Sequence, residues 1–376
     1  MITFKQYLPE KNSSFQAELD SLKEQGFIVK EGQIAGDDVV LVFPAHMGVE
    51  WNKDNMIYRS SIWTLQGEPV SLSLPKFFNY GEQPNLVPDP TTLQGSIAIG
   101  KIDGSLLCTS KYKDEFIART RGTFDARILD NGFEIDELLK KYPKVANNKY
   151  INSEEYSVIY EWVSPNNKII LDYGAEPDLF LTAVIRHKDY KLLSQAEVDK
   201  ISLEIDVQRP EQFEFSDIGT MLSSIKALQG QEGICLYYGD DGQCIKKVKS
   251  DEYLSLHRFK SNLSPKNMLE MYFQYGKPDY DTFMKYIERD FDYENAVASS
   301  EMIEMVIQVH EDFNVEMKHI KRLVAPLKKL PRAEAARAIM SKMDKSKTGL
   351  AFNALDDKEI PDMKLKDILL NNLKEI

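Results

Sequence analysis

The sequence has few cysteines, and this scarcity excludes two kinds of stabilisation. Only three of the 376 residues are cysteines, namely Cys108, Cys235 and Cys244. Three cysteines cannot form a disulfide framework, and no two of them have the two-residue spacing of a zinc-binding pair. The composition therefore predicts a protein of a reducing compartment, and we expect it in the cytoplasm.

The sequence also lacks a long apolar run and an excess of positive charge. No stretch approaches the length of a membrane span, and residues 1–13 lack the apolar core of a signal peptide. The net charge is −12, whereas proteins that coat nucleic acids rely on Lys and Arg to neutralise phosphates. We therefore expect a soluble protein with no membrane partner, in which a polyanion would bind to a local patch.

One local patch of positive charge lies near the C-terminus. Between Lys318 and Lys347, ten basic residues accompany only two acidic ones, Glu334 and Asp344. Such a run is typical of a solvated helix face and equally of a surface that contacts a polyanion. The sequence leaves both interpretations open.

Two patterns of apolar residues divide the chain. Up to about Leu256, short apolar or alternating runs are separated by turn residues, as in antiparallel strands. Beyond Pro265, apolar residues recur at spacings of three and four, as in helices. We therefore predict an α+β fold. Residues 1–261 would form a domain of antiparallel sheets with flanking helices, and residues 262–376 would form an all-helical domain.

The same patterns predict individual elements. We expect strands over residues 39–43, 70–74, 157–163, 169–171, 179–185, 233–238 and 244–248, with a hairpin turn at 239–242. We expect helices over residues 266–275, 280–291, 332–343 and 363–373, and one or two helices between 295 and 330. Pro326 and Pro331 should break or kink the helical chain.

Gly95 and Lys101 match the spacing of a phosphate-binding P-loop, but their context excludes such a loop. Ile102 follows the lysine and offers no hydroxyl group for Mg²⁺. The residues between the glycine and the lysine form an apolar strand sequence, and residues 103–109 indicate a turn and a second strand instead of a phosphate-binding helix. The alternative is that the Lys101 amine itself attacks a phosphate.

Attack by a lysine requires its neutral amine. An ordinary lysine has a pKa of about 10.4, so burial or neighbouring cations must favour the uncharged form at neutral pH. Lys247 and Lys249 alternate around Val248 and would point to one face of a strand. We expect these two cations to lower the pKa of Lys101 and to stabilise charge on a phosphate. Taken alone, they would be ordinary solvated lysines.

A set of short motifs carries a resemblance to a known family. The matching segments are residues 101–105 (Lys-Ile-Asp-Gly-Ser, motif I), 161–171 (motif III), 232–234 (Glu-Gly-Ile, motif IV) and 247–250 (Lys-Val-Lys-Ser, motif V). They occur in the order found in covalent nucleotidyltransferases, which form a lysyl-nucleotide. Arg59 and residues 76–79 resemble the element that precedes the lysine in RNA ligases of T-even bacteriophages. Over about residues 59–257, the chain thus resembles the bacteriophage RNA ligase 1 family.

Two features favour RNA ligases within this superfamily. Leu106 stands where DNA ligases and capping enzymes usually place an arginine. Those enzymes usually append an oligonucleotide-binding β-barrel, whereas residues 262–376 are expected to be helical, as in the bacteriophage family. A DNA ligase, a capping-type enzyme that uses GTP, and a non-catalytic RNA-binding protein with the same fold remain as alternatives.

The resemblance implies an ATP-dependent RNA ligase. Lys101 would attack the α-phosphorus of ATP, the AMP would pass to an RNA 5′-phosphate, and a 3′-hydroxyl would then displace it. The cofactors would be ATP and Mg²⁺ or Mn²⁺. The RNA could be a cleaved tRNA, and the helical domain would contribute RNA specificity. We expect a monomer, in the host cytoplasm if a bacteriophage encodes it.

The resemblance also implies roles for basic residues besides Lys101. Arg59, Lys76 and Arg121 would bind nucleotide phosphates. Lys247 and Lys249 would grip the α-phosphate and share in catalysis.

Three acidic residues complete the implied site. Glu161 would hold the ribose, and Glu232 would help to bind the metal because carboxylate oxygens suit hard divalent cations. Asp103 would act in catalysis by orienting Lys101 or an ion. The chain departs from the family pattern at Ser60, where a glycine usually follows the arginine.

Overall fold

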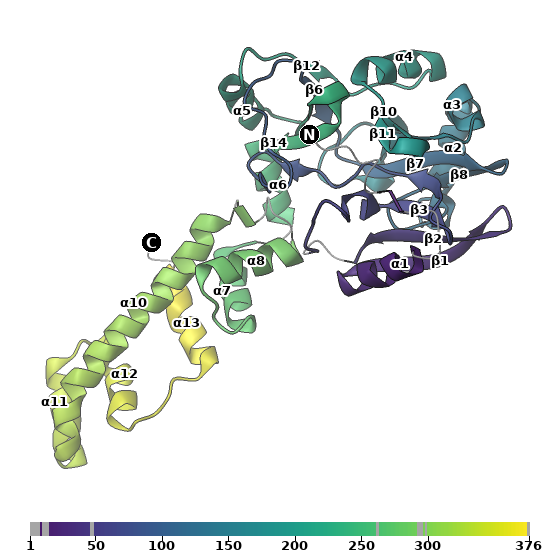
Figure 1. Ribbon diagram of the computed structural model, residues 1–376. Coiled ribbons are helices and arrows are strands. Elements are labelled where there is room, and N and C mark those ends of the chain that lie inside the picture. Colours follow the sequence, from purple (N-terminus) through teal and green to yellow (C-terminus); the bar gives the residue numbers. More distant parts are fainter. Residues whose placement is uncertain are drawn as a thin grey trace. The chain divides into compact units, whose positions relative to one another are not determined.

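A computed structural model describes residues 8–9, 15–45, 49–260, 263–291, 296–297 and 299–373. The chain divides into two compact units, Met1–His257 and Arg258–Ile376, whereas the sequence prediction places the boundary at residue 262. The first unit contains sheets and helices and the second is helical, so the predicted α+β class is confirmed (Figure 1).

Within its described residues, the first unit contains three sheets. One has four consecutive strands, which are β1 (Phe27–Ile34), β2 (Asp37–Pro44), β3 (Ser61–Thr64) and β4 (Pro69–Leu72). The second has the order β11–β10–β9–β7–β8, and the third has the order β12–β6–β13–β14–β5. The described strand pairs are antiparallel apart from β5 and β14, which are parallel.

The two five-stranded sheets carry the predicted motifs. Their strands are β5 (Phe78–Asn79), β6 (Ile97–Lys101), β7 (Ser105–Tyr112), β8 (Glu115–Arg119), β9 (Tyr156–Val163), β10 (Asp178–Arg186), β11 (Lys191–Leu192), β12 (Gln212–Phe213), β13 (Gly233–Tyr238) and β14 (Cys244–Lys249). The hairpin turn expected between β13 and β14 is present as a short 3₁₀ turn, η7 (Asp240–Gly242).

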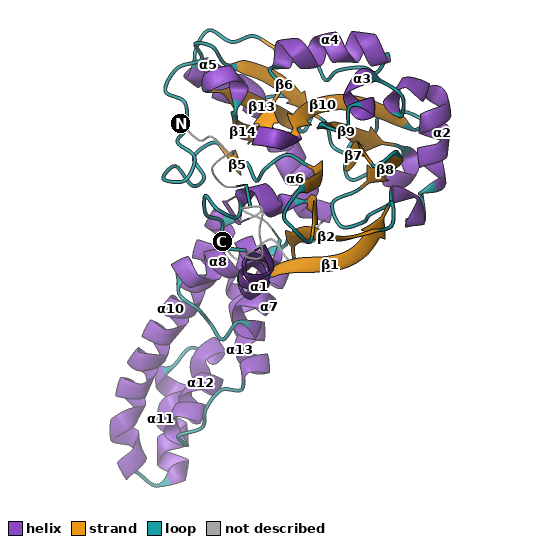
Figure 2. Ribbon diagram, turned by 45° about the vertical axis from the view of Figure 1, so that its right-hand side comes forward, coloured by secondary structure: helices purple, strands orange, loops and turns teal. Residues whose placement is uncertain are grey.

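Helices flank these sheets (Figure 2). They are α1 (Phe15–Glu24), α2 (Phe133–Lys141), α3 (Lys149–Asn152), α4 (Gln195–Ile205), α5 (Ile218–Lys226) and α6 (Asp251–Lys260). Helix α4 packs on β10, and α5 packs on β13 and β14. Local sequence sets their starts, because Ser194 and Glu197 form a capping box for α4 and Asp217 caps α5. Apolar residues such as Val42, Ile99 and Ile159 join the three sheets in one core.

The strand expected over residues 169–171 is absent, and this prediction is wrong. The segment is an irregular loop. The backbone N–H groups of Ile170 and Leu171 donate to the Asp103 carboxylate at 2.8 and 2.9 Å. A side chain distant in the sequence therefore satisfies backbone groups that a neighbouring strand would otherwise engage.

The second unit is built from helices that share one apolar core. They are α7 (Pro265–Gln274), α8 (Tyr280–Asp290), α10 (Ser300–Val324), α11 (Arg332–Lys342), α12 (Lys345–Leu355) and α13 (Asp362–Leu373). Buried residues of α10, such as Val306 and Phe313, lie in a core that these helices share. Pro326 lies in the 3₁₀ turn η8 (Ala325–Lys329) and Pro331 directly precedes α11, so both prolines interrupt the helical chain as predicted.

Candidate functional site

Strand register brings Lys101 and Lys249 to one face of a sheet. Gly233 of β13 pairs with Lys101 of β6 on one side and with Lys249 of β14 on the other. Directly opposite residues point to the same face, so the two lysines flank the glycine. Gly233 has φ +146°, and an added Cβ would lie 2.0 Å from the Val248 carbonyl oxygen. Only glycine lets the strands approach in this way.

The Glu232 carboxylate lies between these two lysines. Its Oε2 is 2.7 Å from Lys101 Nζ, and its Oε1 is 3.1 Å from Lys249 Nζ. The glutamate side chain is only 2% exposed, so water screens these ion pairs poorly. One residue from each of motifs I, IV and V thus takes part in an ionic cluster around a buried carboxylate.

Neighbouring carboxylates control the charge of Lys101. Burial lowers the pKa of its amine, but attraction to Glu232 and Glu161 outweighs burial and raises that pKa above its ordinary value. The expected net lowering of the Lys101 pKa is therefore wrong. A neutral amine requires that the charge of the carboxylates be offset.

Glu161 belongs to the same cluster. It lies on β9 opposite Leu106 of β7 and accepts a hydrogen bond from the Gly104 backbone N–H. Burial raises the pKa of Glu161 to about 7 against the attraction of Lys101, and repulsion from Glu232 adds to the increase. Two carboxylates that repel each other form an oxygen-rich donor set.

Arg59 and Arg121 add positive charge near these carboxylates. Arg59 ends the 3₁₀ helix η2 (Met56–Arg59), and its guanidinium lies 4.8 Å from the centroid of the Phe77 ring. Burial lowers the pKa of Arg59, and repulsion from Arg121 lowers it further, whereas attraction to Glu161 opposes both effects. Two guanidinium groups that repel each other are a suitable place for an anion.

Arg119 supports this region, and sequence reasoning did not identify it. Its fully buried guanidinium donates to the Ser60 hydroxyl at 2.6 Å and to the Ser71 hydroxyl at 2.8 Å. The Ser60 hydroxyl in turn donates to the Arg121 carbonyl at 3.0 Å. The serine that departs from the family pattern therefore links Arg119 to the backbone of Arg121.

Lys247 and Cys235 occupy the next row of the same sheet face. Cys235 pairs with Lys247 on β14 and with Ile99 on β6, two residues before Lys249 and Lys101 respectively. The predicted alternation of Lys247 and Lys249 is thus present. Burial raises the pKa of the Cys235 thiol to about 11, so the thiol is protonated at neutral pH.

Lys76 contacts aromatic rings. Its ammonium lies 5.4 Å from the centroid of the Trp51 ring and 5.0 Å from that of Phe78. Its backbone N–H donates to the Met56 carbonyl at 2.9 Å, which ties Lys76 to the helix that carries Arg59. Phe78 is buried in the core.

Asp103 is bonded to two other segments of the chain. One carboxylate oxygen accepts from the backbone N–H groups of Ile170 and Leu171, and the other accepts from the Tyr253 hydroxyl at 2.8 Å. The Asp103 backbone N–H donates to the Tyr173 hydroxyl oxygen at 2.8 Å. Asp103 therefore fixes the turn that follows Lys101.

The cluster can supply oxygen ligands for a divalent cation. Within the described residues, no group of three or more His, Cys, Asp or Glu side chains is arranged to hold a metal. Glu161 and Glu232 nevertheless lie close enough to repel each other, and nucleotide phosphates would provide further oxygens. Both oxygens of Glu232 face lysine amines, so a cation there would compete with Lys101 or Lys249.

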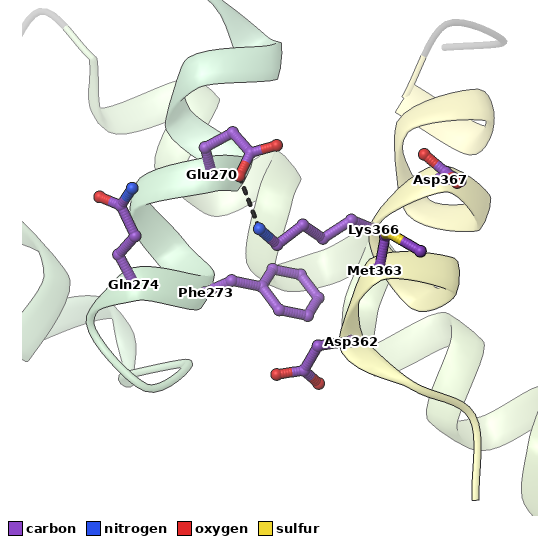
Figure 3. Close-up of a pocket in the computed structure, with 7 residues that line it drawn as sticks. All are labelled: Glu270, Phe273, Gln274, Asp362, Met363, Lys366 and Asp367. Atoms are coloured by element: carbon purple, nitrogen blue, oxygen red, sulfur yellow. Dashed lines mark hydrogen bonds and ion pairs between the residues drawn. The ribbon is translucent and has the colours of Figure 1, made fainter.

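A separate hollow of about 290 Å³ lies in the helical unit. Figure 3 shows Lys366 of α13 pointing toward Glu270 of α7, with Phe273 beside them. Lys366 Nζ lies 2.6 Å from the Glu270 carboxylate and 5.4 Å from the centroid of the Phe273 ring. None of the predicted site residues lines this hollow.

No described helix is long and apolar enough to cross a membrane.

Comparisons with known proteins identify relatives of the chain. A family model described as RNA ligase matches residues 59–274. An RNA ligase of Rhodothermus phage RM378 is 25% identical in an alignment that covers 78% of this chain and 82% of the phage protein. A protein of Autographa californica nuclear polyhedrosis virus, whose name combines polynucleotide kinase and RNA ligase, is 26% identical over 174 residues. That match covers 43% of this chain and 24% of the viral protein, so the chain matches about a quarter of this relative's length.

Solved structures include a more distant likeness. An archaeal ATP-dependent RNA ligase has a TM-score of 0.46 and 13% identity, with 95% of both chains covered. A likeness this low gives no information about function.

Proposed function

Because the chain belongs to the RNA ligase family, we propose that it joins RNA 5′-phosphate and 3′-hydroxyl ends with ATP through a lysyl-AMP at Lys101. One observation carries this proposal, namely the buried Glu232 carboxylate held between the amines of Lys101 and Lys249. This cluster supplies a nucleophile, a second cation for a phosphate and a carboxylate that fixes both.

Formation of the adenylate starts with loss of a proton from Lys101. The ion pair with Glu232 favours the protonated amine, so the negative charge of the cluster must first be offset. A divalent cation held by Glu161, Glu232 and the phosphates would supply that positive charge and help to neutralise the leaving pyrophosphate. The neutral Lys101 nitrogen then forms a bond to the α-phosphorus of ATP, and the bond from that phosphorus to pyrophosphate breaks.

Basic residues around Lys101 would hold the phosphates during this transfer. Lys249 can turn from Glu232 toward the α-phosphate, and Lys247 projects from the same strand face. Arg59 and Arg121 would bind the other phosphates, since an anion between them would relieve their mutual repulsion. Glu161 would accept hydrogen bonds from the ribose once its carboxylate is ionised.

Two further transfers complete the reaction. An oxygen of the RNA 5′-phosphate attacks the phosphorus of the adenylate and a P–O bond forms. The P–N bond to Lys101 breaks as its nitrogen takes up a proton from solvent, which restores the amine. The RNA 3′-hydroxyl, after losing its proton, then attacks the activated 5′-phosphate. A phosphodiester bond forms and AMP leaves, so the same site can serve all three steps.

Labelled ATP tests the first step directly. With ATP labelled on the α-phosphate, Mg²⁺ and no RNA, we expect an acid-labile label bound to the protein. The label should be absent with γ-labelled ATP and in Lys101→Ala. No adduct with ATP, or an adduct only with GTP, would contradict the proposal.

Joining assays test the nucleic acid. RNA ends should be joined and the equivalent DNA ends should not, and preference for DNA would favour the alternative of a DNA ligase. We propose cleaved tRNA as the natural substrate and the helical unit as a source of RNA specificity. Faster joining of a cleaved tRNA than of an unstructured RNA of equal length would support this substrate, and equal rates would oppose it.

A further inference from the structure

Tyr253 touches two parts of the lysine cluster. It lies in α6, immediately after β14, and its side chain is 3% exposed. Its hydroxyl donates to the Asp103 carboxylate at 2.8 Å, and the centroid of its ring lies 4.9 Å from Lys249 Nζ. One buried side chain thus connects the turn after Lys101 with a lysine proposed to bind phosphate.

The Asp103 carboxylate connects Tyr253 to a loop. Its other oxygen accepts from the backbone N–H groups of Ile170 and Leu171, and the Asp103 backbone N–H donates to Tyr173. Asp103 is itself 3% exposed, so water cannot easily replace a lost donor. The Tyr253 hydroxyl therefore helps to hold a turn that begins one residue after Lys101.

The start of α6 fixes Tyr253 relative to Glu232. The Ser250 hydroxyl accepts from the Tyr253 backbone N–H at 3.2 Å and donates to the Gln231 carbonyl at 2.7 Å. The Ser250 backbone N–H donates to the Glu232 carbonyl at 2.9 Å. Tyr253, Glu232 and Lys249 are consequently held in one local frame.

We propose that Tyr253 is a positioning residue for the transfer of AMP to Lys101. Its hydroxyl holds Asp103 and thereby the turn that places the Lys101 amine, and its ring holds the Lys249 ammonium by a cation–π contact. This inference rests on the proposed ligase function. The hydroxyl affects the position of the nucleophile, whereas the ring affects nucleotide binding.

Two substitutions separate these contributions in single-turnover adenylylation. Tyr253→Phe keeps the ring and loses the hydroxyl, so the maximal rate should fall about tenfold because the nucleophile is misplaced. The ATP concentration for half-maximal rate should stay within about twofold. Tyr253→Leu also loses the ring, so this ATP concentration should rise about tenfold in addition. An unchanged maximal rate in Tyr253→Phe would overturn the proposal.

Tyr112→Phe is a matched control. The Tyr112 hydroxyl also donates to an aspartate, Asp37, at 2.6 Å, and both residues lie outside the lysine cluster. Its rate and ATP dependence should equal those of the wild type. An equal loss of rate in Tyr112→Phe and Tyr253→Phe would show a general effect of losing a tyrosine hydroxyl, and the positioning role would be refuted.

A double-mutant cycle tests whether Tyr253 acts through Asp103. If it does, Tyr253→Phe combined with Asp103→Asn should be no slower than Asp103→Asn alone, within about twofold. Rate losses that multiply would show that the two residues act independently and would overturn this route.

Hydrogen exchange tests the positioning role without any reaction. In the full chain without nucleotide, amides in residues 168–174 should exchange faster in Tyr253→Phe than in the wild type or Tyr112→Phe, because the carboxylate that binds them has lost a donor. Unchanged exchange would overturn the positioning role. A wild-type protein that forms no adduct with ATP would refute the ligase proposal instead, and the exchange result would still decide whether Tyr253 holds the turn.

Discussion

Glu232 holds two lysine amines with one buried carboxylate. The arrangement favours a charged Lys101, although nucleophilic attack needs the neutral amine. The ion pair with Glu232 thus holds the Lys101 amine in place and favours its protonated form. Binding of ATP with a divalent cation would add phosphate negative charge and metal positive charge, and the balance between them would set the reactivity of Lys101.

The charge state of Lys101 yields a prediction at the scale of a single residue. Glu232→Gln removes the largest attraction on the Lys101 ammonium but leaves its burial, so the pKa of the amine should fall. Lys101 should then react faster with an amine-specific reagent at neutral pH, as measured by mass spectrometry of the labelled peptide.

Glu134→Gln provides the control for this labelling. Glu134 is also a buried carboxylate, but it accepts hydrogen bonds from Trp162 and Asn166. Labelling of Lys101 should not change in this variant. Slower or equal labelling of Lys101 in Glu232→Gln would contradict the assigned cause of the raised pKa.

His187 gives a second prediction, on stability. Burial lowers the pKa of His187 to about 4, and its ring nitrogen shares a hydrogen bond of 2.8 Å with the Ser157 hydroxyl. Between pH 6.5 and 4 the unfolded chain binds a proton at His187 that the folded chain does not. The contribution of His187 to stability is therefore complete above pH 6.5 and falls by about 1.4 kcal/mol per pH unit as the pH decreases through this window.

Denaturant unfolding at several pH values checks the effect of His187. His187→Gln should lose this pH dependence, although its stability at pH 7.5 can differ from that of the wild type. Glu161 contributes in the opposite direction, because its pKa is raised and its folded form binds the extra proton between pH 4.5 and 7. In His187→Gln, the free energy of unfolding should therefore decrease as the pH rises. A slope of this free energy against pH equal to that of the wild type would contradict the prediction.

At the scale of elements, the start of β13 meets two requirements with two consecutive residues, Glu232 just before the strand and Gly233 as its first residue. Glu232 supplies the shared carboxylate, and Gly233 allows β6 and β14 to come close on either side. Gly233→Ala would place a Cβ 2.0 Å from the Val248 carbonyl oxygen, at a backbone conformation of φ +146° that alanine rarely adopts. We expect a loss of about 3 kcal/mol or more in the free energy of unfolding, and loss of adenylylation with it.

Gly349→Ala is the comparison for this substitution. Gly349 lies in α12, and among the described residues no heavy atom beyond its chain neighbours and its own helix backbone lies within 4 Å of the position of its added Cβ. The free energy of unfolding should rise by about 1 kcal/mol because alanine favours helix. A tolerated Gly233→Ala would show that the strands can separate at low cost.

The hairpin of β13 and β14 was predictable because its apolar strands and glycine-containing turn are local signals. Helix α12 was missed because its sequence combines lysines, Ser346 and Gly349, which give little helical periodicity. The order of the motifs made it possible to predict which residues from distant segments form the site. The contact between Lys101 and Glu232 joins residues 131 positions apart. The raised pKa of Lys101 depends on this contact and could not be predicted without the fold.

At the scale of the whole molecule, the negative net charge limits where RNA can bind. In the described part of the chain, some basic residues between Lys318 and Lys347 form ion pairs with nearby carboxylates, and others do not. Lys328 pairs with Asp357, Arg332 pairs with Asp356, and Lys347 pairs with Glu316.

In contrast, Lys318, Lys321 and Arg322 lie three and four residues apart on α10, away from its buried side. The ion pairs found among the described residues include none of these three. The positive charges of Lys318, Lys321 and Arg322 are therefore available to bind phosphates.

This division gives a sharper test of the basic stretch than its total charge does. We expect replacement of Lys318, Lys321 and Arg322 by Gln to weaken RNA binding and to reduce the slope of log affinity against log salt by about 2, at about 0.7 for each lost contact with single-stranded RNA. Replacement of Lys328, Arg332 and Lys347 by Gln removes the same formal charge but only from ion pairs, so the slope should stay nearly constant. Equal slopes for both triple variants and the wild type would mean that this face of α10 is solvated and that RNA binds elsewhere.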